Sequence, residues 1–278
     1  MKTLIQKAKK ISTKLPKMKI SSNKSVSQDF GDSKDNKKGS GEEFWDFREY
    51  KIGDPLKMID WRKSSKSDKL FIKNNENESS KNVWFWVNKN VSMNFSNYSN
   101  LDTKHERALI IGLILVDIFL KSGEKVGVIG SELGLQKGQN KFIPIASELI
   151  NKSTKLNETR IKKNDIVFII SDFLQQKDKI KKNLLGITES SYLGLLIQVL
   201  DPAEKNFPFK GRNRFFDPVS GLHKLFNKSE NMQDKYKNEV MIHQSKISQM
   251  CSKFGWKFFT NTTNQSYESL ILKIYNNI

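Results

Sequence analysis

Polar residues follow two apolar segments that have the composition of buried strands. Asn88, Asn90 and Ser92 come directly after an unbroken apolar run. Asp172 follows a second apolar run, which ends at Ile170. Because ligands of open parallel sheets bind beyond the carboxyl ends of the strands, these residues are the first candidates for a binding site.

Enzymatic chemistry has little support in the sequence. Four acidic residues could act as general acids or bases: Asp54, Asp60, Asp201 and Glu204. Asp beside Gly or Pro, however, usually belongs to a turn. The three histidines lack a metal-binding spacing such as H-x-x-x-H, and no glycine-rich phosphate loop follows a strand. We therefore expect no catalytic activity.

Strand and helix signals alternate from Val83 to the end of the chain. The predicted strands cover residues 83–87, 125–129, 165–170, 193–200 and 256–259. The predicted helices cover residues 103–121, 145–152, 175–190, 229–252 and 267–276. Thr103 begins the first of these helices with capping-box spacing to Glu106. The alternation predicts an α/β fold with a parallel sheet flanked by helices on both faces.

An aromatic segment, residues 41–80, precedes the predicted sheet, and Trp45, Tyr50 and Trp61 lie in it close to Arg48 and Arg62. It could form a stacking platform for single-stranded nucleic acid. We favour a small core that packs on the main domain, because fewer than about 40 residues cannot bury enough surface alone. The charged residues would then pair at its rim.

Residues 1–40 are predicted to be a basic, flexible segment and linker. Residues 1–38 contain eleven lysines and three acidic residues. Apolar residues recur there at helical spacing between Leu4 and Met18. This pattern fits a helix on a membrane surface, or a short helix that docks on the protein itself. We favour docking, because the stripe lacks Trp and Phe anchors.

Composition limits the location and the partners. We see no apolar signal-peptide core after the basic N-terminus, and the longest apolar run, Ala108–Leu120, is shorter than the about 20 residues that span a bilayer. The single cysteine, Cys251, fits a buried thiol in a reducing compartment, so we expect a cytoplasmic protein. The net charge is +18, but it comes from lysines scattered among asparagines. Specific nucleic-acid readers favour Arg, so the charge predicts non-specific binding at most.

Several sequence blocks resemble the bacterial domain-of-unknown-function-58 (DUF58) family. They are GSGEEFWDFREYKIGDPLKMIDWRKSSKSDKLFIK, VWFWVNKNVSMNF, SDF and VLDPAEKNFPFKG. The residues that carry the resemblance are Arg48, Glu49, Tyr50, Gly53, Asp54, Asp60, Trp61, Arg62, Asp201, Pro202 and Glu204. The resemblance implies a von Willebrand factor A-like domain over residues 81–278.

In metal-binding von Willebrand A domains, the first strand ends in Asp-x-Ser-x-Ser, and a distant Thr and Asp complete the site. The matching positions here are Asn88, Asn90, Ser92 and Asp172; the Thr has no assigned counterpart. Asn88 lacks the negative charge, and Lys89 adds a positive one. Mg²⁺ relies on carboxylates, so we expect a degenerate site that is empty or binds Mg²⁺ weakly. Alternatively, the two asparagines bond to the loop backbone and keep only the shape of the site.

The resemblance implies an interaction module without its own cofactor. Family members are often encoded beside MoxR-type AAA+ ATPases and are thought to help them act as chaperones that assemble or activate other proteins. The alternative is a basic protein that binds nucleic acid non-specifically. Exposure of Trp45 and Trp61 would favour that alternative.

Overall fold

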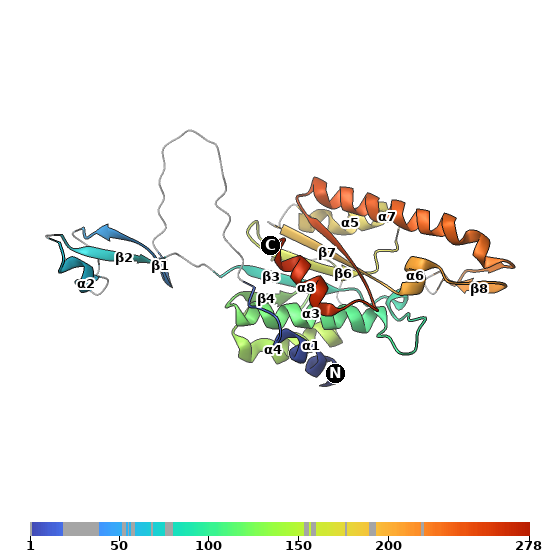
Figure 1. Ribbon diagram of the computed structural model, residues 1–278, viewed down its shortest axis with the longest axis horizontal. Coiled ribbons are helices and arrows are strands. Elements are labelled where there is room, and N and C mark those ends of the chain that lie inside the picture. The colour runs from blue at the N-terminus through green and yellow to red at the C-terminus, as the bar shows by residue number, and fades with distance from the viewer. Residues whose placement is uncertain are drawn as a thin grey trace. The chain divides into compact units, whose positions relative to one another are not determined.

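The chain divides into two compact units in the computed structural model (Figure 1). The sheet unit comprises residues 1–21 and 81–278, and the hairpin unit comprises residues 22–80. The structure describes residues 2–18, 39–51, 54, 56, 59–67, 69–75, 80–152, 156, 160–175, 177–188, 193–217 and 220–278.

A six-stranded sheet forms the centre of the sheet unit. The strand order is β10-β7-β6-β3-β4-β5. Its strands are β3 (Asn82–Val87), β4 (Lys125–Val128), β5 (Gln136–Lys137), β6 (Ile166–Ser171), β7 (Leu193–Leu200) and β10 (Lys257–Thr262). All neighbouring pairs are parallel except β4 and β5. The predicted α/β fold, which is Rossmann-like, is therefore confirmed.

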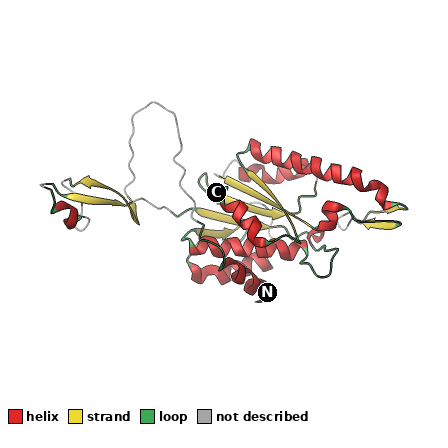
Figure 2. Ribbon diagram, in the orientation of Figure 1, coloured by secondary structure: helices red, strands yellow, loops and turns green. Residues whose placement is uncertain are grey.

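Helices cover both faces of this sheet (Figure 2). One core contains apolar residues of α1 (Lys2–Ser12), α3 (Lys104–Lys121), α4 (Phe142–Asn151) and α8 (Tyr267–Tyr275). The other contains residues of α5 (Lys177–Thr188) and α7 (Gln233–Lys253). The central strands are long apolar runs because both of their faces are covered.

Helix α3 is buried along almost its whole length. Its N-terminus carries the predicted capping box: the Thr103 side chain accepts from the Glu106 main-chain N–H, and the Glu106 carboxylate accepts from the Thr103 N–H. Gly123 follows the helix with φ of 84°, a left-handed conformation that favours glycine. These two local signals fix where α3 begins and ends, and so place its first residue at the carboxyl edge of the sheet.

The N-terminal helix differs from the predicted flexible segment. Ile5 and Ala8 of α1 are buried in the same core as α3. The Ser12 hydroxyl donates to the Asp117 carboxylate of α3 at 2.5 Å. Residues 2–18 therefore belong to the sheet unit, because the apolar residues of α1 pack against apolar residues of α3. Residues 19–38 of the predicted flexible segment and linker lie outside the described residues, and residues 39 and 40 belong to a strand of the hairpin unit.

A short helix and a β-hairpin between β7 and α7 have no counterpart in the sequence prediction. Helix α6 (Pro202–Asn206) directly follows β7, and strands β8 (Asn213–Phe216) and β9 (His223–Phe226) then form an antiparallel hairpin. A short 3₁₀ turn, Ser229–Met232, leads from the hairpin into α7. These elements are too short for the spacing of their apolar residues to show a helical or strand periodicity.

The hairpin unit contains β1 (Gly39–Glu49), α2 (Trp61–Ser64) and β2 (Phe71–Asn75). Strands β1 and β2 are antiparallel. Ile59 and Ile72 form a bridge between their backbones, and both side chains are buried. Among the described residues of the chain, no helix is long and apolar enough to cross a membrane.

Candidate functional site

The loop after β3 is held by the side chain of Asn88, which is buried. Its amide nitrogen donates to the Ser171 hydroxyl at 2.9 Å, and its amide oxygen accepts from the Asn90 main-chain N–H at 3.0 Å. The Ser171 hydroxyl in turn lies 3.4 Å from the Asp172 carboxylate. Asn88 thus ties the ends of β3 and β6 together, while Asn90 joins this network through its backbone.

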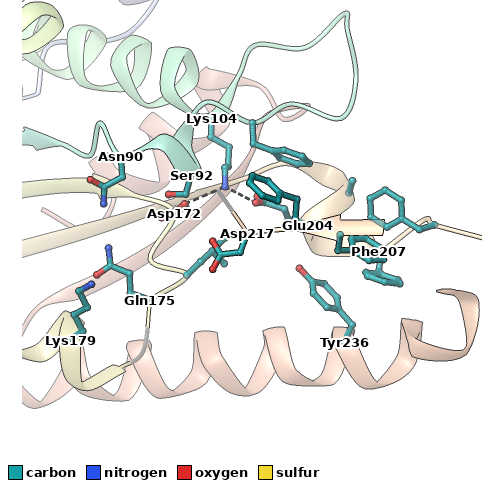
Figure 3. A pocket seen from close by; sticks show the side chains of 16 residues that line it. Asn90, Ser92, Lys104, Asp172, Gln175, Lys179, Glu204, Phe207, Asp217 and Tyr236 are labelled. Atoms are coloured by element: carbon teal, nitrogen blue, oxygen red, sulfur yellow. Dashed lines mark hydrogen bonds and ion pairs between the residues drawn. The ribbon is translucent and has the colours of Figure 1, made fainter. Parts of the chain in front are cut away.

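Lys104, the first residue of α3, places its ammonium between two carboxylates (Figure 3). Its Nζ lies 3.3 Å from Asp172 Oδ2 and 2.6 Å from Glu204 Oε1. The side chains of Lys104 and Asp172 are only 1% and 2% exposed, and that of Glu204 is 16% exposed. We call these three residues the buried ion triad.

Lys89 does not supply the charge beside Asp172 that the sequence suggested. Its ammonium donates to the main-chain carbonyls of Ile150, at 3.0 Å, and Lys152, at the C-terminal end of α4. Desolvation lowers the pKa of Lys89 to about 8. The positive charge that contacts Asp172 is therefore that of Lys104.

The segment Asp201–Glu204 positions the third member of the triad. The Asp201 carboxylate caps α6 by accepting from the Ala203 N–H at 2.7 Å, and it also accepts from the Asn97 N–H at 3.1 Å. Glu204 Oε2 accepts from the Asp201 N–H at 3.0 Å, which completes a capping box between these two residues, and Pro202 lies in the first turn of the helix. The capping box leaves Oε1 of Glu204 for the Lys104 ammonium. Burial raises the pKa of Glu204, although the Lys104 charge opposes this shift.

A cavity of about 700 Å³ opens beside the triad (Figure 3). Asn90, Ser92 and the triad line one side of it. Aromatic side chains from the segment between β7 and α7, and one from α7 itself, line the other side: Phe207, Phe209, Phe215 and Phe216, with Tyr236 of α7. Phe207 holds this wall together, because its ring lies 4.7 Å from that of Tyr236 and 5.4 Å from that of Phe215, centroid to centroid.

The cavity offers few groups for chemistry. Its described lining contains neither His nor Cys. Burial raises the pKa of Tyr236 to about 12, so its hydroxyl is neutral near pH 7. Cys251 is buried on α7, and burial raises the pKa of its thiol to about 12, so it is unsuited to act as a nucleophile.

The residues at the strand ends do not fit a divalent cation as they lie. The Asn88 amide oxygen is already bonded to a main-chain N–H, and the Asp172 carboxylate is bonded to an ammonium. Mg²⁺ gives up its hydration reluctantly and usually needs free carboxylate oxygens. Among the described residues, no group of three His, Cys, Asp or Glu side chains could hold a metal ion.

The remaining motif residues lie in the hairpin unit. Arg48, Glu49 and Tyr50 are at the end of β1, and the Tyr50 N–H donates to the Leu70 carbonyl at 2.8 Å. Glu49 forms an ion pair with Lys69 at 2.5 Å. Gly53 lies outside the described residues, as do the side chains of Arg48 and Trp45.

The other acidic motif residues of this unit have local structural roles. Asp54 accepts from the Lys51 N–H at 2.9 Å, and Asp60 caps α2 by accepting from the Lys63 N–H at 2.9 Å. Trp61 and Arg62 are exposed, and 63% of Trp61 is accessible to solvent. Two of the acidic residues considered for catalysis therefore stabilise a turn and a helix end.

Sequence reasoning missed Lys104 and the aromatic wall. A signal for Lys104 does exist, because a cation in the first turn of a helix opposes the helix dipole and needs a compensating anion nearby. Nothing local shows that the anions come from residues 172 and 204. The repeated Phe residues of NFPFKG are visible in the sequence, but their common orientation depends on the hairpin.

Comparisons with known proteins place the chain in a family. A family model described as "Protein of unknown function DUF58" matches residues 46–246. Comparison with curated proteins finds no match. Two solved structures resemble the chain. One is the conserved hypothetical protein BatB from Bacteroides thetaiotaomicron, with 13% identity and a TM-score of 0.36, over 72% of this chain and 100% of that one.

The second is an aerotolerance-related membrane protein from Bacteroides fragilis that carries multiple mutations to serine. It has 12% identity and a TM-score of 0.37, over 71% of this chain and 98% of that one. The family match extends from β1 to α7 and so covers most of both units. The protein therefore belongs to the DUF58 family.

Proposed function

We propose that the protein is a non-catalytic interaction module whose sheet unit is a von Willebrand factor A-like domain. The cavity beside the buried ion triad would dock a segment of a partner protein. The observation that supports this is the composition of the cavity, which combines an aromatic wall with the buried ion triad, whose three charges are paired with one another. Aromatic, well-formed cavities of this kind suit binding of apolar side chains.

The proposed partner is a MoxR-type AAA+ ATPase, which the family resemblance implies. The module would help the ATPase to assemble or activate other proteins, and it would do so in the cytoplasm. Apolar side chains at the rim of the cavity are available for such a contact. Leu174 is 44% exposed, and Phe216 is 64% exposed.

Substitution of these rim residues tests the proposal. Leu174→Asp and Phe216→Asp should each weaken binding of the purified ATPase by about tenfold or more, because a charge replaces an apolar side chain that the bound partner would cover. Leu272→Asp on α8 is the matched control, since Leu272 is also 44% exposed but does not line the cavity. Surface plasmon resonance with the ATP-loaded ATPase would measure the affinities. Equal affinity of all three variants would reject the cavity as the docking site.

One observation supports non-specific nucleic-acid binding as a second candidate. Trp61 is exposed next to Arg62, and the chain carries a net charge of +18. An exposed indole beside a cation can stack on an unpaired base. Trp61→Ala should then weaken binding to single-stranded oligonucleotides more than binding to duplexes. An unchanged affinity for single strands would remove the support that Trp61 gives.

A further inference from the structure

The buried ion triad lies where the predicted metal-site residues converge. Asp172 belongs to the triad, and Asn90 and Ser92 line the same cavity. Both acidic members bring an oxygen within 3.3 Å of the same nitrogen atom of Lys104. A single cation therefore holds together carboxylates from two different strand ends, after β6 and after β7.

The three charges depend on one another. A buried ammonium is costly unless anions pair with it, and Lys104 also opposes the dipole of α3 from its first turn. Two buried carboxylates that approach one another are likewise costly unless a cation lies between them. The ammonium thus performs the electrostatic task that a bound divalent cation performs among acidic ligands.

We infer that Lys104 is a built-in cation that replaces a divalent metal at this site, so that the cavity is assembled and meets its partner without a metal bridge. The inference deepens the proposed function and rests on it only for the partner. The claim that the site assembles without a metal is supported by the contacts of the Lys104 ammonium with the carboxylates of Asp172 and Glu204. A plain structural ion pair would have the same contacts, but its loss would create no affinity for metal.

Removal of the Lys104 ammonium distinguishes a cation that replaces a metal from a plain structural ion pair. Lys104→Met keeps the length of the side chain and leaves Asp172 and Glu204 without their cation. We expect Ca²⁺ or Mn²⁺ to raise the melting temperature of this variant, and to bind at least about tenfold more tightly than to the native chain, because two carboxylates become free ligands. Thermal unfolding and isothermal titration with CaCl₂ and MnCl₂ would measure both effects.

Two controls define the result. Lys89→Met removes a nearby ammonium that contacts carbonyls rather than carboxylates, so it should gain no metal affinity. Lys104→Met combined with Glu204→Gln removes the cation and one carboxylate together, so it should also gain none. A gain in either control, or micromolar Mg²⁺ affinity in the native chain, would overturn the inference.

Folding of the variant is itself informative. If Lys104→Met folds only when Ca²⁺ or Mn²⁺ is present, the metal has replaced the ammonium, as inferred. If it stays unfolded with and without metal, or folds with no response to metal, the inference fails. Asn88→Asp with Asn90→Ser introduces the Asp and Ser of the metal-binding von Willebrand A pattern, and we expect this pair to raise metal affinity only when Lys104→Met accompanies it.

Failure of the inference can be told apart from failure of the proposed function. The metal measurements require no partner, whereas the rim substitutions report partner binding alone. If the ATPase does not bind but the metal results are as expected, only the proposed function fails. If the ATPase binds at the cavity but the native chain requires Mg²⁺ for its own fold or for that contact, only the inference about Lys104 is rejected, and the proposed function stands.

Discussion

The Asn88 side chain lies in the loop after β3, and both of its polar atoms form hydrogen bonds. The amide donates and accepts at once, which a carboxylate in the same place could not do. This explains why asparagine suits the position in a site built around an ammonium. The amide keeps the loop in shape and adds no charge to the triad.

Loss of this amide should destabilise the sheet unit. Asn88→Ala leaves the Asn90 N–H without its partner and removes one hydrogen bond from the buried Ser171 hydroxyl, so we expect a loss of about 1–3 kcal/mol in unfolding free energy. Urea unfolding would measure it. Asn94→Ala in the same loop is the control, because Asn94 is exposed and its loss should change stability by less than about 0.5 kcal/mol. Equal losses in both variants would contradict the role of Asn88.

Lys89 should make stability depend on pH. Burial lowers its pKa to about 8, below the value of about 10.4 in an unfolded chain. Between these values the unfolded chain binds more protons, so the contribution of Lys89 to stability rises with pH and is least favourable below about 8. The native chain should therefore gain stability relative to Lys89→Met between about pH 7 and about pH 9.5, as measured by urea unfolding. A constant difference would show that the Lys89 pKa is not lowered.

Among the helices, α1 is held against α3 by an apolar contact, and polar pairs beside it stabilise the packing. Ala8 is fully buried between them, and Lys7 pairs with Asp102 at 2.6 Å, just before α3. The Asp102 carboxylate also accepts from the Tyr267 hydroxyl at 2.5 Å. The apolar stripe that could have bound a membrane surface is therefore covered by the protein itself.

A charge in this contact should release the helix. Ala8→Glu would bury an unpaired carboxylate or undock α1, and we expect it to cost about 3 kcal/mol in unfolding free energy. Hydrogen exchange should also become faster in α1. Lys10→Glu introduces the same side chain at an exposed position of the same helix and should leave exchange unchanged. Slow exchange in α1 of Ala8→Glu would mean that the contact with α3 is not what orders it.

Helix α6 and the β8–β9 hairpin together form one side of the cavity. The capping box of α6 fixes Glu204, and Phe207 ends this helix in a left-handed conformation with φ of 47°. That turn brings the Phe207 ring against Phe215 of the hairpin. The segment between β7 and α7 therefore supplies both an ionic member of the site, Glu204, and the phenylalanines of its aromatic wall.

At the scale of the whole molecule, the charge predicts how nucleic acid would bind. The chain has 48 Lys and Arg residues against 30 Asp and Glu residues. Contacts from scattered lysines only neutralise phosphates, so affinity should fall by orders of magnitude between about 50 mM and about 200 mM salt and should not depend on sequence. Fluorescence anisotropy with unrelated oligonucleotides would measure this. Sequence-selective binding at about 200 mM salt would contradict it.

Local sequence patterns are enough to predict the alternating strands and helices of the sheet unit. Val83–Val87 and Ile166–Ile170 are apolar on every residue, which requires strands covered on both faces, and the Thr103–Glu106 pair marks the start of α3. The same patterns also predict that Asn88 and Asp172 meet at one edge of the sheet, because the carboxyl ends of parallel strands share that edge. These signals are local, so no contact between distant segments was needed to find them.

The pairing of the buried charges, in contrast, depends on contacts between distant segments and could not be predicted from the sequence. Lys104, Asp172 and Glu204 come from three segments, and their pairing depends on strand order and on the turn of α6. The same holds for Lys89, whose ammonium turns to the end of α4 because carbonyl oxygens lie there. A side-chain type shows which bonds it can form, but the buried partner that satisfies it is set by packing. For that reason the sequence identified the edge of the sheet, and the fold identified the cation that occupies it.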